Sequence, residues 1–168
     1  MKTLKQHIEE KLIINKDFKY INNYFLYKID KEEKIKIFHY NWTEWSKYIH
    51  NVYINGEHIN LDGLGRTEKI YKPGTYEVKI KDIDDITNCG GMFSYCNQLI
   101  NVPLFDTSKV INMRWMFSDC FKLEEVPLFD TSKVKDMEGM FGKCYNLSDE
   151  TKELWTTIYD FENDDKRK

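Results

Sequence analysis

Four cysteines are the residues whose spacing most resembles a chemical site. Cys96, Cys120 and Cys144 follow one another at intervals of 24 residues, and Cys89 precedes them. A ladder of thiols could bind a metal ion or act as a redox switch. None of the four forms the Cys-x-x-Cys pair of zinc sites, so the spacing does not support a metal cage. We expect small, buried, reduced side chains that face the core.

Two aspartates recur at the same interval as the cysteines. Asp106 and Asp130 each stand two residues before a serine, Ser108 or Ser132, and the set could be a calcium site or a catalytic ladder. Calcium sites in repeated β-structures need closely spaced acids around glycine, which this stretch lacks. We therefore expect turn chemistry, in which a side-chain oxygen accepts a backbone N–H.

The remaining polar residues match no catalytic motif. The four histidines are scattered, with no His-Glu-x-x-His or Gly-x-Ser-x-Gly pattern near them. The stretch Gly63–Gly65 lacks the spacing of a phosphate-binding loop. The sequence predicts a protein that is not an enzyme and holds neither metal nor cofactor.

Composition excludes several classes of partner. The net charge is −3, and the repeated segment Met92–Leu147 carries six Lys/Arg against seven Asp/Glu, so no basic face for nucleic acid is expected. No apolar run approaches the 18 or so residues of a membrane span. The N-terminal Met1–Phe18 has a charge every few residues and no apolar stretch, unlike a secretory signal.

An internal repeat organises the second half of the chain. Residues 92–115 and 116–139 share 15 of their 24 positions, and a third copy begins at Met140. A degenerate half-copy, Lys81–Phe93, precedes them. Repeats of this length cannot bury an apolar face alone, so we expect a solenoid of stacked coils about 4.8 Å apart.

Each coil is expected to contain a strand, a turn and a short helix. Leu99–Leu104 fits a strand, although Pro103 and its counterpart Pro127 lack the N–H that a ladder needs, so the strands must be short. Asp-Thr-Ser supplies the turn. Apolar residues within Val110–Phe117 recur at helical or 3₁₀ spacing, which predicts a short helix.

Both ends of the repeats need caps. A helix over residues 148–161, with Ser148 as N-cap, is expected to close the last coil, and residues 162–168 to form a disordered tail. Residues 21–81 are expected to form an antiparallel β-rich domain behind a helix or leader at residues 1–20. Three hairpins are predicted in it: Asn23–Ile29 with Lys34–Tyr40, Asn51–Ile54 with Glu57–Leu61 across Asn55-Gly56, and Glu68–Lys72 with Tyr76–Ile80 across Pro73-Gly74. The fold class is therefore α+β, a short leucine-rich-repeat solenoid over residues 82–147 with a cap at each end.

The frame Met-Phe-x-x-Cys-x-x-Leu-x-x-Val-Pro-Leu-Phe-Asp-Thr-Ser-Lys-Val resembles the BspA-type leucine-rich repeat. That repeat is known from bacterial surface proteins, mycoplasma lipoproteins and phage or mobile-element chains. The resemblance covers residues 82–147, and Lys72–Ile80 resembles the strand that often leads into such repeats. It implies binding, either adhesion or contact with another protein, and no catalytic activity.

Candidate binding residues lie where the two full copies differ. Ile100, Trp115 and Phe121 are apolar at positions where the other copy is polar or glycine, and Arg114 and Glu125 also differ. Such residues form an interface if they are exposed, or pack on the N-terminal sheet if they are not.

A second candidate surface is an aromatic platform made of Trp42, Trp45 and Tyr48. The alternative is that these side chains fill the core of the β-rich domain.

These observations predict a non-enzymatic module that recognises another protein. The alternative is a phage-encoded virion or assembly component, because Met1–Phe18 is similar to short leaders on tailed-phage proteins and would serve as a docking or packaging tag. As written, the chain is expected in the cytoplasm, or in a host cytoplasm or virion if phage-encoded. Neither the partner nor the oligomeric state follows from the sequence.

Overall fold

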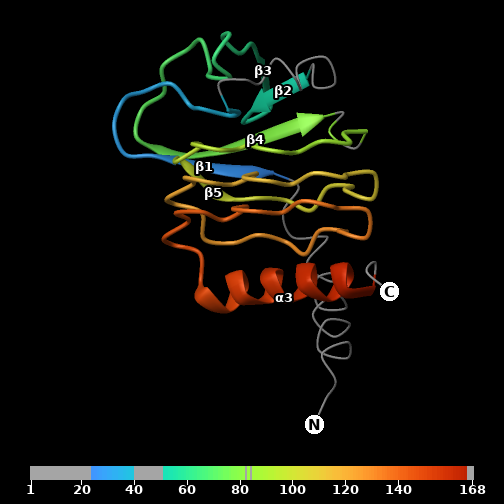
Figure 1. Ribbon diagram of the computed structural model, residues 1–168. Helices are drawn as coiled ribbons and strands as arrows, with labels where there is room; N and C mark the ends of the chain where they lie inside the picture. The colour runs from blue at the N-terminus through green and yellow to red at the C-terminus, as the bar shows by residue number, and fades with distance from the viewer. Residues whose placement is uncertain (1–23, 40–50, 82, 84, 166–168) are drawn as a thin grey trace.

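The computed structural model describes residues 24–39, 51–81, 83 and 85–165. These residues form an open five-stranded antiparallel sheet, the repeats below it, and a single helix that lies across the far end of the repeats (Figure 1). The strand order is β3-β2-β4-β1-β5. The elements are β1 (Phe25–Ile29), β2 (Asn51–Ile54), β3 (Glu57–Ile59), β4 (Gly74–Lys81), β5 (Leu99–Asn101) and α3 (Asp149–Asp165).

The hairpin predicted at Asn55-Gly56 is present. β2 pairs with β3, with Ile54 opposite Glu57. Asn55 and Gly56 both have positive φ, 48° and 85°, as the two-residue turn of the I′ type requires. Only residues that tolerate this conformation close a hairpin in two residues, which is why the signal was readable from sequence.

The other two predicted hairpins are wrong. β1 pairs with β4 and β5, and residues 34–39 form no strand. Glu68–Lys72 is likewise not a strand, and β4 pairs with β1 and β2 instead. Ile35 is completely buried, and its N–H donates to the Thr67 hydroxyl at 3.0 Å rather than to a neighbouring strand. Residues 34–39 are therefore held by the burial of Ile35 and by its bond to the Thr67 side chain, not by pairing with β1.

β5 joins the repeats to the sheet. It belongs to the first full copy and pairs antiparallel with β1, with Tyr27 opposite Leu99. It ends at Asn101, before Pro103, so the expectation of short strands is confirmed. In the second copy the same position makes only an isolated parallel bridge, from Asn101 to Glu125.

Consecutive copies lie one over another in parallel register. Asn88 bridges Asn112, and Asn112 bridges Asp136, each 24 residues further along the chain. We call residues 88–96, 112–120 and 136–144 the first, second and third turn segments. Each N–H of Cys89, Gly91, Phe93 and Tyr95 donates to a carbonyl of the second segment, and the same four positions of the second segment donate to the third.

The turn segments form no continuous helix, contrary to prediction, although the bonds within them span three residues as in a 3₁₀ turn. The N–H of Met92 donates to the carbonyl of Cys89, and that of Met116 to Met113, so each segment is a series of tight turns. Positive φ recurs every 24 residues in two columns: Gly91, Trp115 and Gly139 at 67°, 53° and 64°, and Tyr95, Asp119 and Lys143 at 59°, 60° and 58°. A left-handed residue every four positions prevents a helix. Turns that bury one side can carry the same apolar spacing as a helical stripe.

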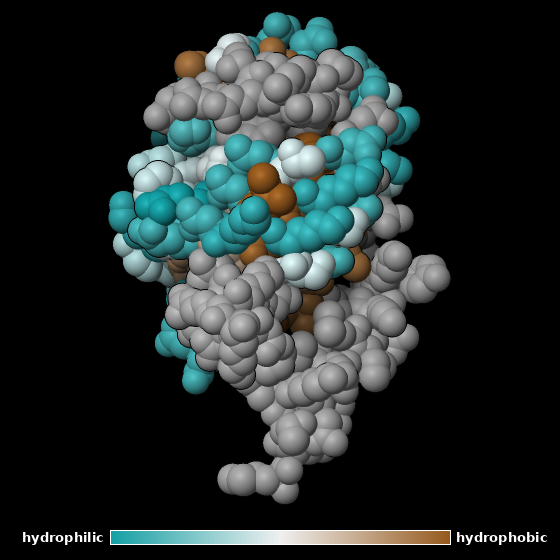
Figure 2. All heavy atoms as spheres, turned by 45° about the vertical axis from the view of Figure 1, so that its right-hand side comes forward, coloured by the Kyte–Doolittle hydropathy of each residue, from teal (hydrophilic) through white to brown (hydrophobic). Residues whose placement is uncertain are grey.

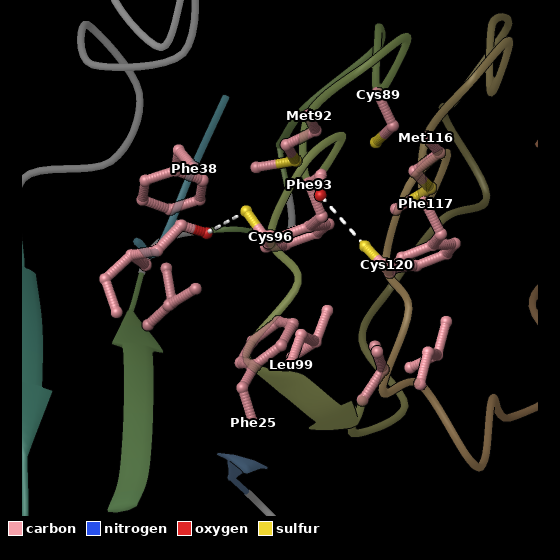
Figure 3. Close-up of a cluster of buried hydrophobic side chains, with 14 of the residues drawn as sticks. Phe25, Phe38, Cys89, Met92, Phe93, Cys96, Leu99, Met116, Phe117 and Cys120 are labelled. Carbon is pink, nitrogen blue, oxygen red and sulfur yellow. Dashed lines mark hydrogen bonds between the residues drawn. The ribbon is translucent and has the colours of Figure 1, made fainter. Parts of the chain in front are cut away.

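The core is continuous from the sheet to α3. Phe93, Phe117 and Phe141 stack nearly parallel, with ring centroids 5.6 and 5.9 Å apart. Phe25 of β1 packs against Phe93 at 5.1 Å, so the sheet shares this core, as Figure 3 shows. Identical residues in successive copies thus become neighbours in space.

α3 covers the last copy. The Ser148 hydroxyl accepts the Thr151 N–H at 3.1 Å, which confirms the predicted N-cap. Trp155 packs on Phe129 and Phe141, with centroids 5.9 and 6.0 Å apart. The helix continues to Asp165 rather than ending at residue 161, so part of the predicted tail is helical.

Candidate binding surface

The cysteine ladder is structural. All four thiols are buried and free. The Cys120 and Cys144 thiols donate to the carbonyls of Phe93 and Phe117, both at 3.1 Å, and Figure 3 shows the first of these bonds. Burial raises the pKa of Cys96 to about 12 and that of Cys144 to about 11. The thiols therefore stay protonated and unreactive, as the expectation of core side chains implies.

The repeated aspartates shape turns. Asp106 accepts the Ser108 N–H, and Asp130 accepts the Ser132 N–H, both at 2.9 Å. The backbone N–H and the side chain of Ser108 lower the pKa of Asp106, with smaller contributions from Lys109 and Lys133. Among the described residues, no group of three or more His, Cys, Asp or Glu side chains is arranged to hold a metal ion.

Trp115 is an exposed aromatic residue on the second turn segment. The residue is 51% exposed, and its backbone is left-handed. The Arg114 guanidinium lies 4.4 Å from the ring centroid. On the third segment, a Cβ built on Gly139 would come within 2.4 Å of the indole. The indole therefore lies against the bare backbone of the next copy, a fit that needs glycine there.

Arg114 holds its own position through two acids of the third segment. Its guanidinium contacts Asp136 at 3.3 Å and Glu138 at 2.5 Å. The guanidinium therefore contacts the two acids and the Trp115 ring at the same time. The structure brings the predicted residues Arg114 and Trp115 into contact.

Phe121 belongs to a neighbouring column on the same edge. Its ring stacks on Tyr145 at 5.7 Å, and Tyr145 is 71% exposed. Tyr95, on the first segment, is half exposed, stacks on His39 at 5.8 Å and lies under the Lys36 ammonium. We call Tyr95, Trp115, Phe121 and Tyr145 the aromatic edge.

A charged pair lies within this edge. Lys143 contacts Asp119 at 2.9 Å, one copy apart, and Asp119 is buried. The bond from Asp119 raises the pKa of Lys143, and the phenols of Tyr95 and Tyr145 act in the same direction. Both tyrosines therefore lie near this ammonium group, which makes the edge a mixture of aromatic and charged groups.

The other predicted residues lie elsewhere. Ile100 is on β5, half-buried, and its carbonyl accepts the Glu124 N–H. Glu125 is exposed and accepts the Asn101 amide at 3.2 Å. Both belong to the strand side of the copies, separate from the turn segments that carry Trp115.

The proposed aromatic platform of Trp42, Trp45 and Tyr48 lies outside the described residues. Among the residues that Figure 2 colours, hydrophilic ones predominate and hydrophobic ones form only a small area.

Sequence reasoning missed Tyr95 and Tyr145. The comparison was made only between the two full copies, in which Tyr95 aligns with Asp119 and Asn97 aligns with Phe121. Extending the alignment into the third copy places Tyr145 under Phe121 and was the available signal.

No helix in the described part of the chain is long and apolar enough to cross a membrane.

The described residues define a class of repeat-containing protein in which an antiparallel sheet continues into parallel-stacked copies. Residues 70–163 match the family described as "Mycoplasma protein of unknown function, DUF285". This match covers more than half of the chain, which therefore belongs to that family. Neither the curated proteins nor the solved structures gave a match.

Proposed function

We propose that the chain is a non-enzymatic module that recognises another protein, and that residues 82–147 form a short solenoid of the BspA-like leucine-rich-repeat type. The 24-residue period falls within the range of such repeats, about 20 to 29 residues. The parallel bridges between copies support the stacked arrangement. A stack of this kind is rigid and exposes its variable positions on its edges.

The observation that supports the proposal most directly is the exposed position of Trp115 on the second turn segment. A half-exposed tryptophan stands where the copies on either side have glycine, Gly91 and Gly139. A left-handed conformation costs a non-glycine residue about 1–2 kcal/mol. Contacts with Arg114 and Gly139 fix the ring on the surface, so little side-chain entropy is lost on binding.

The experiment uses the residue that the neighbouring copies already carry. Trp115→Gly is compatible with the backbone, so the variant should fold. The tagged chain and this variant would be used as bait in the native host, and captured proteins identified and quantified by mass spectrometry. We expect the original chain to capture a single stoichiometric partner and Trp115→Gly to capture about tenfold less of it. A tenfold loss corresponds to removing roughly 1.4 kcal/mol of binding free energy.

A matched control replaces an exposed apolar residue outside the repeats. Ile70 is exposed, and Ile70→Ser should retain the partner. Equal retention by Trp115→Gly and the control would contradict recognition through the aromatic edge. Capsid and tail proteins recovered with all three baits would instead favour the structural alternative.

A further inference from the structure

The peptide groups of the turn segments form hydrogen-bonded columns that all point the same way. The Cys89 N–H donates to the Asn112 carbonyl, and the Met113 N–H donates to the Asp136 carbonyl, each at 2.8 Å. The Asn112 carbonyl and the Met113 N–H belong to one peptide group. The two bonds therefore make one continuous column of three amides.

Three more columns run beside it. They connect Gly91, Arg114, Trp115 and Glu138; Phe93, Met116, Phe117 and Met140; and Tyr95, Ser118, Asp119 and Gly142. In every column the N–H groups point towards the third segment and the carbonyls towards the first. Aligned amides add their dipoles and polarise one another, as they do in a helix. The third segment is therefore the positive end of four parallel columns.

The two ends of the columns differ. At the first segment, the Met92 carbonyl accepts the His39 N–H at 2.9 Å, which terminates its column on the sheet side. At the third segment, the N–H groups of Met137, Gly139, Phe141 and Lys143 have no acceptor in the part of the chain that the structure describes. Met137 is buried and Phe141 half-buried, whereas Gly139 and Lys143 are exposed, so this row of donors is an accessible edge.

These donors border a groove. A cavity of about 370 Å³ lies between the third segment and α3, lined by Met137–Gly142 and by Lys152, Trp155 and Thr156. The Trp155 Nε1 atom is buried and also has no acceptor among the described residues. The groove thus combines an apolar lining with donors that lack acceptors.

We infer that the third turn segment binds a segment of a partner protein that adopts the same turns and adds as one more layer. The four donors occur at every second residue, so the occupant must offer carbonyls at every second residue. A single anion would engage only one or two of them. The site shares Gly139 and Lys143 with the aromatic edge, but it uses their backbone N–H groups and not the exposed side chains of the edge, so the inference does not depend on the proposed function.

A symmetric dimer through this edge is disfavoured, because two third segments placed face to face would oppose donors to donors. Of the four carbonyls at the opposite end of the columns, that of Met92 already accepts the His39 N–H. The polarity of the columns therefore favours a different chain over a symmetric dimer.

Amide hydrogen exchange tests the open edge directly. In the full-length protein, the N–H groups of Met137, Gly139, Phe141 and Lys143 should exchange faster, by about tenfold or more, than those of Met113, Trp115, Phe117 and Asp119. The second set occupies the same positions one copy earlier and is bonded, so it is an internal control. Equal protection of both sets, or protection lost only after deletion of residues 1–20, would mean that the chain covers its own edge and would overturn the inference.

The probe for binding is a synthetic peptide with the sequence of residues 135–146, carrying Cys144→Ser. Its carbonyls at positions 136, 138, 140 and 142 are those that accept bonds within the stack. Excess peptide should slow exchange of the four third-segment amides by about tenfold. A scrambled peptide with the same effect, no slowing, or dimerisation of the protein with those amides protected would each overturn the inference.

Two variants on α3 locate the site. Thr156 lines the groove, and Thr156→Trp should fill it and weaken peptide binding by about tenfold, measured by fluorescence anisotropy of labelled peptide. Glu153 is exposed on the same helix and is not part of the lining, so Glu153→Trp should leave affinity unchanged. Equal affinity of both variants would place the peptide elsewhere.

Discussion

The interior and the turn edge of the repeats obey different rules. Inside, several columns hold the same residue in successive copies, as with Phe93, Phe117 and Phe141, whose rings stack nearly parallel. On the edge, the column that begins at Tyr95 continues with Asp119 and Lys143. A buried side chain must fit its own copy above and below, whereas an exposed one need not.

Backbone conformation repeats even where the sequence does not. Tyr95, Asp119 and Lys143 share a positive φ although their side chains have nothing in common. The inter-copy bonds impose this conformation, because each turn segment must present its N–H groups in the direction of the next. The edge can therefore vary chemically without altering the stack.

The largest effect is expected from Phe117→Ala. The ring is completely buried between Phe93 and Phe141, and its removal should lower the free energy of unfolding by about 3–5 kcal/mol. Chemical denaturation measures this. A loss below about 1 kcal/mol would show that the stacked column contributes little to stability.

Gly139→Ala tests how the edge and the stack are coupled. The new Cβ would clash with the Trp115 indole at 2.4 Å and occupy a left-handed position, so a loss of about 2 kcal/mol is expected. In the Trp115→Gly background the steric part should disappear and only the backbone cost should remain. A double-mutant cycle with no coupling would contradict the contact.

The buried thiols predict a pH dependence. Burial holds the pKa of Cys96 at about 12, above the ordinary value of 9. The unfolded state therefore loses its thiol proton first as pH rises, so stability is full below pH 9 and falls from there towards pH 12. Each such thiol contributes about 1.4 kcal/mol per pH unit, and Cys96→Ala should reduce the slope by that amount.

The same four thiols should be inert in the folded protein. A thiol reagent at neutral pH should label them only after denaturation, because they are buried and protonated. Rapid labelling of the native protein would contradict the structural role of the ladder.

The smallest effect is expected from Phe121→Asn. Asparagine occupies this column in the first copy as Asn97, and Phe121 is partly exposed. The free energy of unfolding should change by less than about 0.5 kcal/mol, since surface substitutions seldom exceed this. If Phe121→Asn and Phe117→Ala lowered the free energy of unfolding by similar amounts, the distinction between interior and edge would be wrong.

Much of the organisation was predictable because its causes are local. The period of 24, the hairpin at Asn55-Gly56 and the Ser148 cap each depend on residues close in sequence. The candidate surface was predictable only in part. Comparing two copies identified Trp115, Arg114 and Phe121, but not that Ile100 and Glu125 lie on the strand side.

The sequence by itself determined that copies stack and which residues they share inside, because repetition at a fixed interval brings identical side chains into contact. Only the tertiary structure decided the partners of β1, since it pairs with β4 on one side and with β5 on the other, and both are distant from it in sequence. It also decided that the turn segments form no continuous helix, because bonds between copies fix a left-handed residue every four positions. The open row of donors at the third segment follows from that same polarity, which no residue type encodes.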